Sequence, residues 1–304
     1  MPYSLKGRNV LITGGSRGLG AMVAEKFAAE GSNVAINYCT SEERAKELAT
    51  KIEAEHKVKA VVLQGDVALR ADCENLVKKT IELLGGIDVI ISNAGWTKIS
   101  RFGDLNALTD DEWDQCWSTN VKANLHLFRE AEPTFTANPD GGAFIITSSV
   151  AGATPGGSSM AYSVSKAAGL HMMKGLASSQ SPKIRTNAVL PGLLLTEWGQ
   201  RFTTEVKEGY REKTALKSVP DVEDCADVFI TIAKNTSMTG QEIQVVSQNW
   251  FPTGMTDGMG GDSNIMKVRN DGGLCKFKTG VAIIEEDRGM DCILSFLQPS
   301  SQPV

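Results

Sequence analysis

The stretch Ile12-Thr-Gly-Gly-Ser-Arg-Gly-Leu-Gly20 connects a short apolar run, Arg8–Thr13, to a segment with helical periodicity. Four of its nine residues are glycine, the residue that loses most conformational entropy on folding. Bare backbone before a helix lets an anion reach the unpaired N–H groups and the positive dipole of the helix start. The stretch therefore predicts a phosphate-binding loop between a strand and a helix. A tight turn that holds no ligand is the alternative.

The composition is that of a globular protein: 304 residues, 41% hydrophobic and 22% charged. A net charge of −5 argues against a nucleic-acid partner, because phosphate contacts need a clustered positive face. No apolar run approaches the roughly 18 residues that span a bilayer, and residues 1–8 lack the apolar core of a signal peptide. Six cysteines and three histidines are too scattered for a metal site. We expect a cytoplasmic protein without metal, membrane or nucleic-acid contacts.

Short apolar runs alternate with helical patterns along the first 246 residues. The expected strands are Arg8–Thr13, Asn33–Tyr38, Lys59–Gln64, Ile87–Ser92, Gly142–Thr147, Ile184–Leu190 and Glu242–Val246. One expected helix carries Leu19, Met22, Val23 and Phe27 on one face, and another follows Thr109. The others cover Ser41–Glu55, Asp72–Leu84, Met160–Ser179 and Asp221–Lys234. Strands separated by helices pair in parallel. The pattern predicts an α/β fold with one doubly wound parallel sheet of about seven strands, which binds ligands outside the strands' carboxyl ends.

The end of the second expected strand bears on the choice of nucleotide. Folds that bind NAD usually place an acidic residue there, which bonds the ribose 2′-hydroxyl. Here the strand ends in Asn37 and Tyr38, and no acid occurs before Ser41. Arg17, inside the glycine loop, is suited to pair with a 2′-phosphate, although a solvated surface charge is the alternative. The sequence favours NADP(H) over NAD(H).

A tyrosine and a lysine lie four residues apart on an expected helix. Tyr162 and Lys166 therefore share a helix face, and an ammonium near a phenol favours the phenolate and lowers its pKa. Such a pair is common on protein surfaces. Ser148 and Ser149, however, end the fifth strand, where ligands of this fold bind. Tyr162 and Lys166 are therefore candidates for proton transfer.

These motifs together resemble the short-chain dehydrogenase/reductase family, in particular ketoacyl-carrier-protein reductases and fungal NADP-dependent members. The matching residues are TGGSRGLG (13–20), Asp66-Val67, SNAG (92–95), Asn120, Ser149, Tyr162, Lys166 and PGLLLT (191–196). They follow the family's order and spacing over residues 8–246. The resemblance implies one Rossmann domain over residues 1–249, with a substrate lid at about 193–218.

The resemblance also implies roles for individual residues. Tyr162 exchanges a proton with the substrate oxygen, and Ser149 hydrogen-bonds that oxygen; the spacing to the tyrosine selects Ser149 over Ser148. Lys166 lowers the pKa of Tyr162 and holds the nicotinamide ribose, and Asn120 holds a proton-relaying water. The cofactor-binding set is Gly14, Ser16, Arg17, Gly18, Leu19, Gly20, Asn37, Tyr38, Ser41, Asp66, Val67, Asn93, Ala94, Gly95, Tyr162, Lys166, Pro191, Gly192 and Thr196.

The expected function is that of an NADP(H)-dependent oxidoreductase that transfers a hydride between nicotinamide and a carbonyl or secondary alcohol, with Tyr162 as general acid/base. One alternative is a tailoring reductase of secondary metabolism with one bulky substrate. Another is a catalytically silent nucleotide-binding regulator. The expected partner is a small molecule, and the resemblance implies a homodimer or homotetramer.

Residues 250–304 depart from the family pattern. The family usually ends soon after its last strand, whereas this chain continues to Val304. Three interpretations stay open: a disordered extension, which we favour, a cap or partner site, and translated intron. Within the extension, Val281–Ile284 and Cys292–Leu297 are candidates for short elements.

Overall fold

The computed structural model describes residues 3–247, 265–270, 273–278 and 281–283. The chain divides into two units, Met1–Trp250 and Phe251–Val304, which we treat separately. Among the described residues, no helix has the length and apolar character needed to cross a membrane.

The first unit is built on a seven-stranded parallel sheet with the order β3-β2-β1-β4-β5-β6-β7. Its strands are β1 (Asn9–Ile12), β2 (Asn33–Tyr38), β3 (Ala60–Gln64), β4 (Val89–Ser92), β5 (Gly142–Thr147), β6 (Ile184–Pro191) and β7 (Glu242–Val245). All seven expected strands are present within two residues of their expected bounds. The doubly wound parallel sheet is therefore confirmed.

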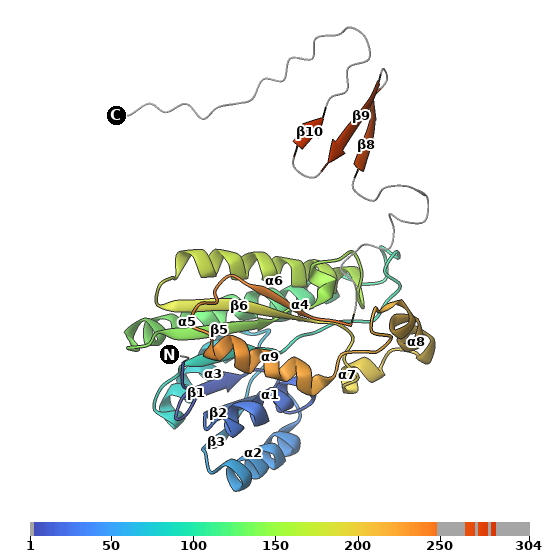
Figure 1. Ribbon diagram of the computed structural model, residues 1–304. Coiled ribbons are helices and arrows are strands. Elements are labelled where there is room, and N and C mark those ends of the chain that lie inside the picture. The colour runs from blue at the N-terminus through green and yellow to red at the C-terminus, as the bar shows by residue number, and fades with distance from the viewer. Residues whose placement is uncertain (1–2, 248–264, 271–272, 279–280, 284–304) are drawn as a thin grey trace, which may run out of the picture. The chain divides into compact units, whose positions relative to one another are not determined.

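Helices connect these strands (Figure 1). They are α1 (Gly18–Ala29), α2 (Glu42–His56), α3 (Arg70–Leu84), α4 (Asp110–Trp117), η1 (Ser118–Lys122), α5 (Ala123–Ala137), η2 (Val150–Gly152), α6 (Met160–Ser179), α7 (Glu197–Gln200), α8 (Thr204–Lys213) and α9 (Val222–Lys234). The helix expected after Thr109 starts there with a capping box, in which the Thr109 side chain accepts from the backbone N–H of Glu112. It is interrupted by the π-helical turn η1, which periodicity does not reveal.

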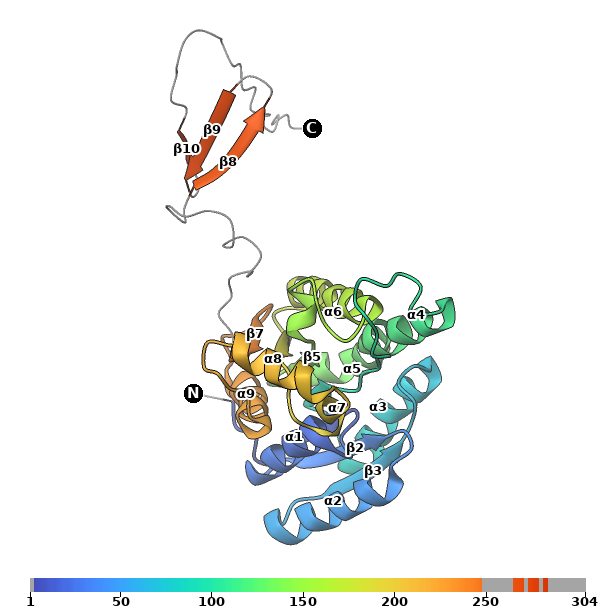
Figure 2. The same cartoon turned by 90° about the vertical axis from the view of Figure 1, so that its right-hand side faces the viewer.

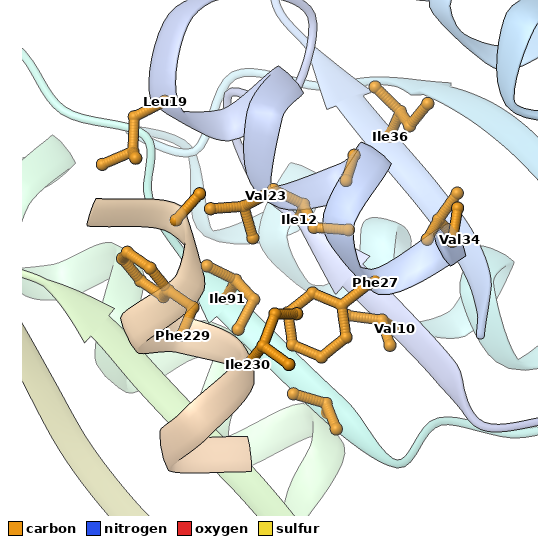
Figure 3. Close-up of a cluster of buried hydrophobic side chains, with 14 of the residues drawn as sticks. Val10, Ile12, Leu19, Val23, Phe27, Val34, Ile36, Ile91, Phe229 and Ile230 are labelled. Atoms are coloured by element: carbon orange, nitrogen blue, oxygen red, sulfur yellow. The ribbon is translucent and has the colours of Figure 1, made fainter. Parts of the chain in front are cut away.

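Two apolar layers cover the sheet. On one face, α1, α2 and α9 pack over the central strands; Figure 3 shows Phe27 of α1 and Ile230 of α9 meeting over β1. On the other face, α3, α5 and α6 bury a second cluster that includes Phe128 and Phe144. Because the strands are buried on both faces, they consist of nearly continuous apolar runs rather than alternating ones.

The chain reverses its direction of strand addition between β1 and β4, which are neighbours in the sheet. The loops after these two strands are tied together by Thr13, whose Oγ1 accepts from the backbone N–H groups of Asn93 at 2.9 Å and Ala94 at 3.0 Å. A gap at such a switch point is where doubly wound folds bind ligands. Figure 2 shows α7 and α8 at the edge where the glycine loop enters α1.

The second unit contains an antiparallel sheet of β8 (Ile265–Asn270), β9 (Gly273–Lys278) and β10 (Val281–Ile283). These strands lie within the extension expected at residues 250–304, and β10 overlaps the expected element at 281–284. The expected element at 292–297 lies outside the described residues.

Candidate active site

A cleft of about 640 Å³ opens at the carboxyl ends of the central strands. Its walls come from the glycine loop, the segments after β2, β4, β5 and β6, the start of α6, and the helices α7 and α8. We call residues 193–218, which contain these two helices, the lid segment, or lid, after the role expected for it. The predicted site residues that line it are Gly14, Ser16, Arg17, Gly18, Leu19, Gly20, Tyr38, Ser41, Asn93, Ala94, Gly95, Ser149, Tyr162, Lys166, Pro191, Gly192 and Thr196. Segments far apart in the sequence thus meet at one site.

The glycine loop is shaped by close backbone contacts. A Cβ on Gly20 would lie 2.3 Å from the carbonyl oxygen of Gly14 and 2.6 Å from Nδ2 of Asn93, closer than nonbonded atoms can approach. Gly14 and Gly18 have φ angles of 60° and 55°, a region that L side chains rarely adopt. The start of α1 has no side-chain cap and no acidic residue in its first turn. Its N–H groups and positive dipole are therefore suited to an anion.

Asn37 supports this loop from beneath and does not line the cleft. Its Oδ1 accepts from the backbone N–H of Gly14 at 3.1 Å, and its Nδ2 donates to the carbonyl oxygens of Leu63 and Gly65. The side chain is buried, and its polar atoms are used in these bonds. Asn37 therefore acts on a ligand only through the position of Gly14.

The catalytic candidates Ser149, Tyr162 and Lys166 face the cleft together. Ser159 caps α6 by accepting from the backbone N–H of Tyr162 at 3.2 Å. One turn further along α6, Lys166 Nζ donates to the carbonyl oxygen of Thr147 at 2.7 Å. This nitrogen lies 5.5 Å from the centroid of the Tyr162 ring. The ammonium has two further donor hydrogens for a ligand.

Burial dominates the electrostatics of this pair. Burial raises the pKa of Tyr162 to about 12, although an interaction with the Ser149 hydroxyl lowers it in part. Burial also lowers the pKa of Lys166 to about 8, against a smaller opposing effect of Cys116. The expected lowering of the tyrosine pKa by Lys166 is therefore not found. The physical reason is that withdrawal of the phenol from water disfavours its charged form.

Asn120 lies on the π-helical turn η1, outside the set of cleft-lining residues. Its Oδ1 accepts from the backbone N–H of Trp96 at 2.9 Å, and its Nδ2 donates to the Trp96 carbonyl oxygen and to Ser165 Oγ. Asn120 thus joins the loop after β4 to α6. Asp66 and Val67 are also absent from the cleft wall, and Asp66 Oδ1 instead accepts from the backbone N–H of Ala68.

The lid adds apolar surface to the cleft. Trp198, Phe202 and Tyr210 line it together with Leu193 and Val206. The Trp198 and Tyr162 ring centroids are 6.2 Å apart, and Tyr210 Oη accepts from the backbone N–H of Leu193 at 3.2 Å. The part of the cleft beside Tyr162 is therefore aromatic.

Several residues in and around the cleft were not predicted from the sequence. Thr147 offers its backbone oxygen to Lys166 and donates from its side-chain hydroxyl to Asn93, and Ser165 contacts Asn120 rather than the cleft. Arg44 lies in the first turn of α2 and pairs with Glu197 of the lid, which also pairs with Arg17. The signal that could have found Ser165 is its position one residue before Lys166 on α6. No sequence signal links Glu197 to the two arginines.

A sequence profile described as short chain dehydrogenase matches residues 8–207. The chain belongs to the short-chain dehydrogenase family. This membership confirms the resemblance and makes the protein an oxidoreductase of that family.

Individual relatives cover most of the first unit. The chain is 34% identical over 245 residues to a protein named as ketoacyl reductase 2 of the granaticin polyketide synthase of Streptomyces violaceoruber, covering 77% of this chain and 93% of the relative. It is 30% identical over 241 residues to a 3-oxoacyl-acyl-carrier-protein reductase of Staphylococcus epidermidis, covering 78% and 97%. A short-chain dehydrogenase from Burkholderia cenocepacia J2315, solved in complex with NADP, aligns with a TM-score of 0.74 at 30% identity, covering 81% and 99%.

Proposed function

We propose that this short-chain dehydrogenase transfers a hydride between NADP(H) and a carbonyl or secondary alcohol, with Tyr162 as the general acid/base. The observation that carries the proposal is the meeting of Ser149, Tyr162 and Lys166 on the same cleft as the glycine loop. Proton donors and a dinucleotide-type loop in one cleft are the parts that a nicotinamide-dependent reaction requires.

The residues present fit the cofactor. The tight Gly14–Gly20 contact and the uncapped start of α1 leave backbone N–H groups free for a pyrophosphate. Arg17 lines the cleft near Tyr38 and Ser41, and no acidic side chain from the end of β2 lines that part. These features favour a 2′-phosphate over a free 2′-hydroxyl. The NADP complex of the Burkholderia relative supports the same choice.

Side chains of the protein supply the proton that the substrate oxygen accepts during reduction. When bound, NADPH supplies the hydride. The pKa of Tyr162 at about 12 keeps Oη protonated at neutral pH, which is the form that donates to a carbonyl oxygen during reduction. Ser149 supplies a second hydroxyl to the developing oxyanion. Lys166, charged below a pKa of about 8, binds the ribose hydroxyls with the donors that Thr147 leaves free.

We further propose that the substrate of this reaction is bulky or extended and apolar. Trp198, Phe202, Val206 and Tyr210 give the lid side of the cleft an apolar and aromatic wall, which recognises hydrocarbon or ring surface. The polyketide-synthase relative from Streptomyces violaceoruber supports an enzyme of this kind. A silent nucleotide-binding regulator is disfavoured because all four catalytic candidates are present.

The test is a titration of the purified protein with NADPH and NADH, followed by NADPH oxidation with small ketones, quinones, β-ketoacyl esters and bulky polycyclic ketones. We expect NADPH to bind more tightly and turnover to be fastest with a bulky ketone. Arg17→Ala should weaken NADPH binding more than NADH binding, and equal losses would contradict the phosphate role. Tight binding without turnover of any ketone would favour the regulator instead.

A further inference from the structure

A single carboxylate of the lid holds two arginines at the rim of the cleft. Arg17 Nη1 donates to Glu197 Oε2 at 3.2 Å, and Arg44 Nη1 pairs with the other oxygen, Oε1. The three residues come from the glycine loop, the first turn of α2 and the start of α7. Both carboxylate oxygens are used, one for each guanidinium.

This cluster lies where the proposed function requires a phosphate. Arg17 and Glu197 line the cleft together with Thr40 and Ser41, the residues that follow β2 and precede α2. In doubly wound folds, the end of the second strand contacts the adenosine ribose. Arg44 follows three residues after Ser41 and is directed to the same point by its contact with Glu197.

The chemistry of the two arginines matches a phosphate as well as a carboxylate. A guanidinium binds either anion through charge-assisted N–H···O bonds. Two guanidinium groups brought to one point repel each other unless an anion lies between them. The cluster therefore presents an anion site that the protein's own carboxylate fills.

We propose that Glu197 and the cofactor 2′-phosphate compete for Arg17 and Arg44, so that Arg44 is a second phosphate-binding residue and Glu197 limits the preference for NADPH over NADH. The inference rests on the proposed NADP(H) function. The exchange is feasible because Arg17, Arg44 and Glu197 are 58%, 51% and 54% exposed, and exposed ion pairs are individually weak and screened by salt.

The residues on either side of Glu197 contact the glycine loop and the surroundings of Tyr162. Thr196 lies against the glycine loop, since a Cβ on Gly18 would be 3.3 Å from the Thr196 Cβ. On the other side, Trp198 has its ring 6.2 Å from that of Tyr162. Glu197 therefore lies between a residue that approaches the glycine loop and a residue whose ring lies beside that of Tyr162.

The test compares wild-type protein with Glu197→Gln, Arg44→Ala and the control Glu212→Gln, titrated with NADPH, NADH and 2′,5′-ADP at low and high salt. Glu212 is on the lid helix α8, so its substitution removes the same charge from the same segment, and no ion pair of its side chain is found in the described residues. Glu197→Gln should tighten NADPH and 2′,5′-ADP binding about threefold to tenfold and leave NADH binding unchanged. Arg44→Ala should weaken both phosphate ligands by a similar factor, and high salt should shrink both effects.

The outcomes separate the two proposals. If wild-type protein prefers NADPH but Glu197→Gln and Arg44→Ala behave like Glu212→Gln, the competition is wrong and the proposed function stands. If wild-type protein binds neither dinucleotide, both proposals fail. A Glu197→Gln variant that tightens NADPH and NADH equally also overturns the competition, because the effect would then not depend on the phosphate.

Discussion

The two ends of the cleft are built in different ways. At the catalytic end, Lys166 is 5% exposed and donates to the Thr147 carbonyl oxygen. Asn120, which does not line the cleft, is 3% exposed and holds the loop after β4 to α6 through Trp96 and Ser165. At the other end, Arg17, Arg44 and Glu197 meet through exposed ion pairs between separate elements. A buried polar group that loses its partner costs about 1–3 kcal/mol, whereas an exposed pair exchanges partners with water or a ligand at little cost.

Because of this difference, we expect the two ends of the cleft to have different functions. The buried end keeps one geometry, as proton transfer requires, because atoms must stay within hydrogen-bond reach. The exposed end is suited to exchange one anion for another. Substitutions at the buried end should therefore change turnover or folding, and substitutions at the exposed end should change cofactor affinity.

The sharpest contrast should come from Tyr162→Phe, which removes the proton donor and keeps the ring. We expect kcat to fall by about 10²- to 10⁴-fold, while NADPH affinity in a fluorescence titration changes little. Tyr210→Phe is the matched control, because it removes only the acceptor of the Leu193 N–H on the lid. If Tyr162→Phe kept more than a tenth of the wild-type rate, the general-acid role would be refuted.

The next effect in size should come from Gly20→Ala. Its Cβ would lie 2.3 Å from the Gly14 carbonyl oxygen, so the glycine loop must shift, and overpacking of this kind costs about 1–3 kcal/mol. Thermal melting and NADPH titration should show a lower Tm and weaker binding.

The matched control for that substitution is Gly175→Ala. Gly175 lies inside α6 with nothing within 4 Å of its added Cβ, and we expect a gain of about 0.5–1 kcal/mol because alanine restricts the unfolded chain. Equal melting temperatures for the two alanine variants would show that the close contact at Gly20 is relieved without cost.

The smallest effect should be a pH dependence. The pKa of Lys166, lowered by burial to about 8, means that the ammonium is charged below this pH and neutral above it. The value of kcat/KM for NADPH should therefore decline severalfold as pH rises from about 7 to 9. The phenol adds no loss in this range, because burial raises the pKa of Tyr162 to about 12.

Lys166→Arg is the control for this pH profile. A guanidinium stays charged throughout the range, so the decline should disappear even if the overall rate is lower. A decline of unchanged midpoint in Lys166→Arg would assign it to another group.

The strands and the glycine loop could be predicted because their physical requirements are local. Buried parallel strands such as Val89–Ser92 need continuous apolar runs, and the Gly14–Gly20 contact excludes any side chain. Ser149, Tyr162 and Lys166 followed from a resemblance whose spacing spans most of the first unit. The described geometry brings these three to one cleft.

The features that sequence reasoning missed depend on long-range partners. Glu197 pairs with Arg44 at a sequence separation of 153 residues, and neither local sequence predicts the pair. Burial of Tyr162 raises its pKa instead of lowering it, because desolvation depends on the whole tertiary environment.

The turn Ser118–Lys122 has a consequence for how this enzyme can change. A π-helical turn holds one more residue than an α-helical turn and is intrinsically less stable. It also carries Asn120, whose bonds to Trp96 and Ser165 depend on that register. A one-residue deletion would join α4 and α5 into a regular helix and rotate the asparagine away from both partners. The position of Asn120 therefore depends on a local departure from the α-helix that a single deletion would remove.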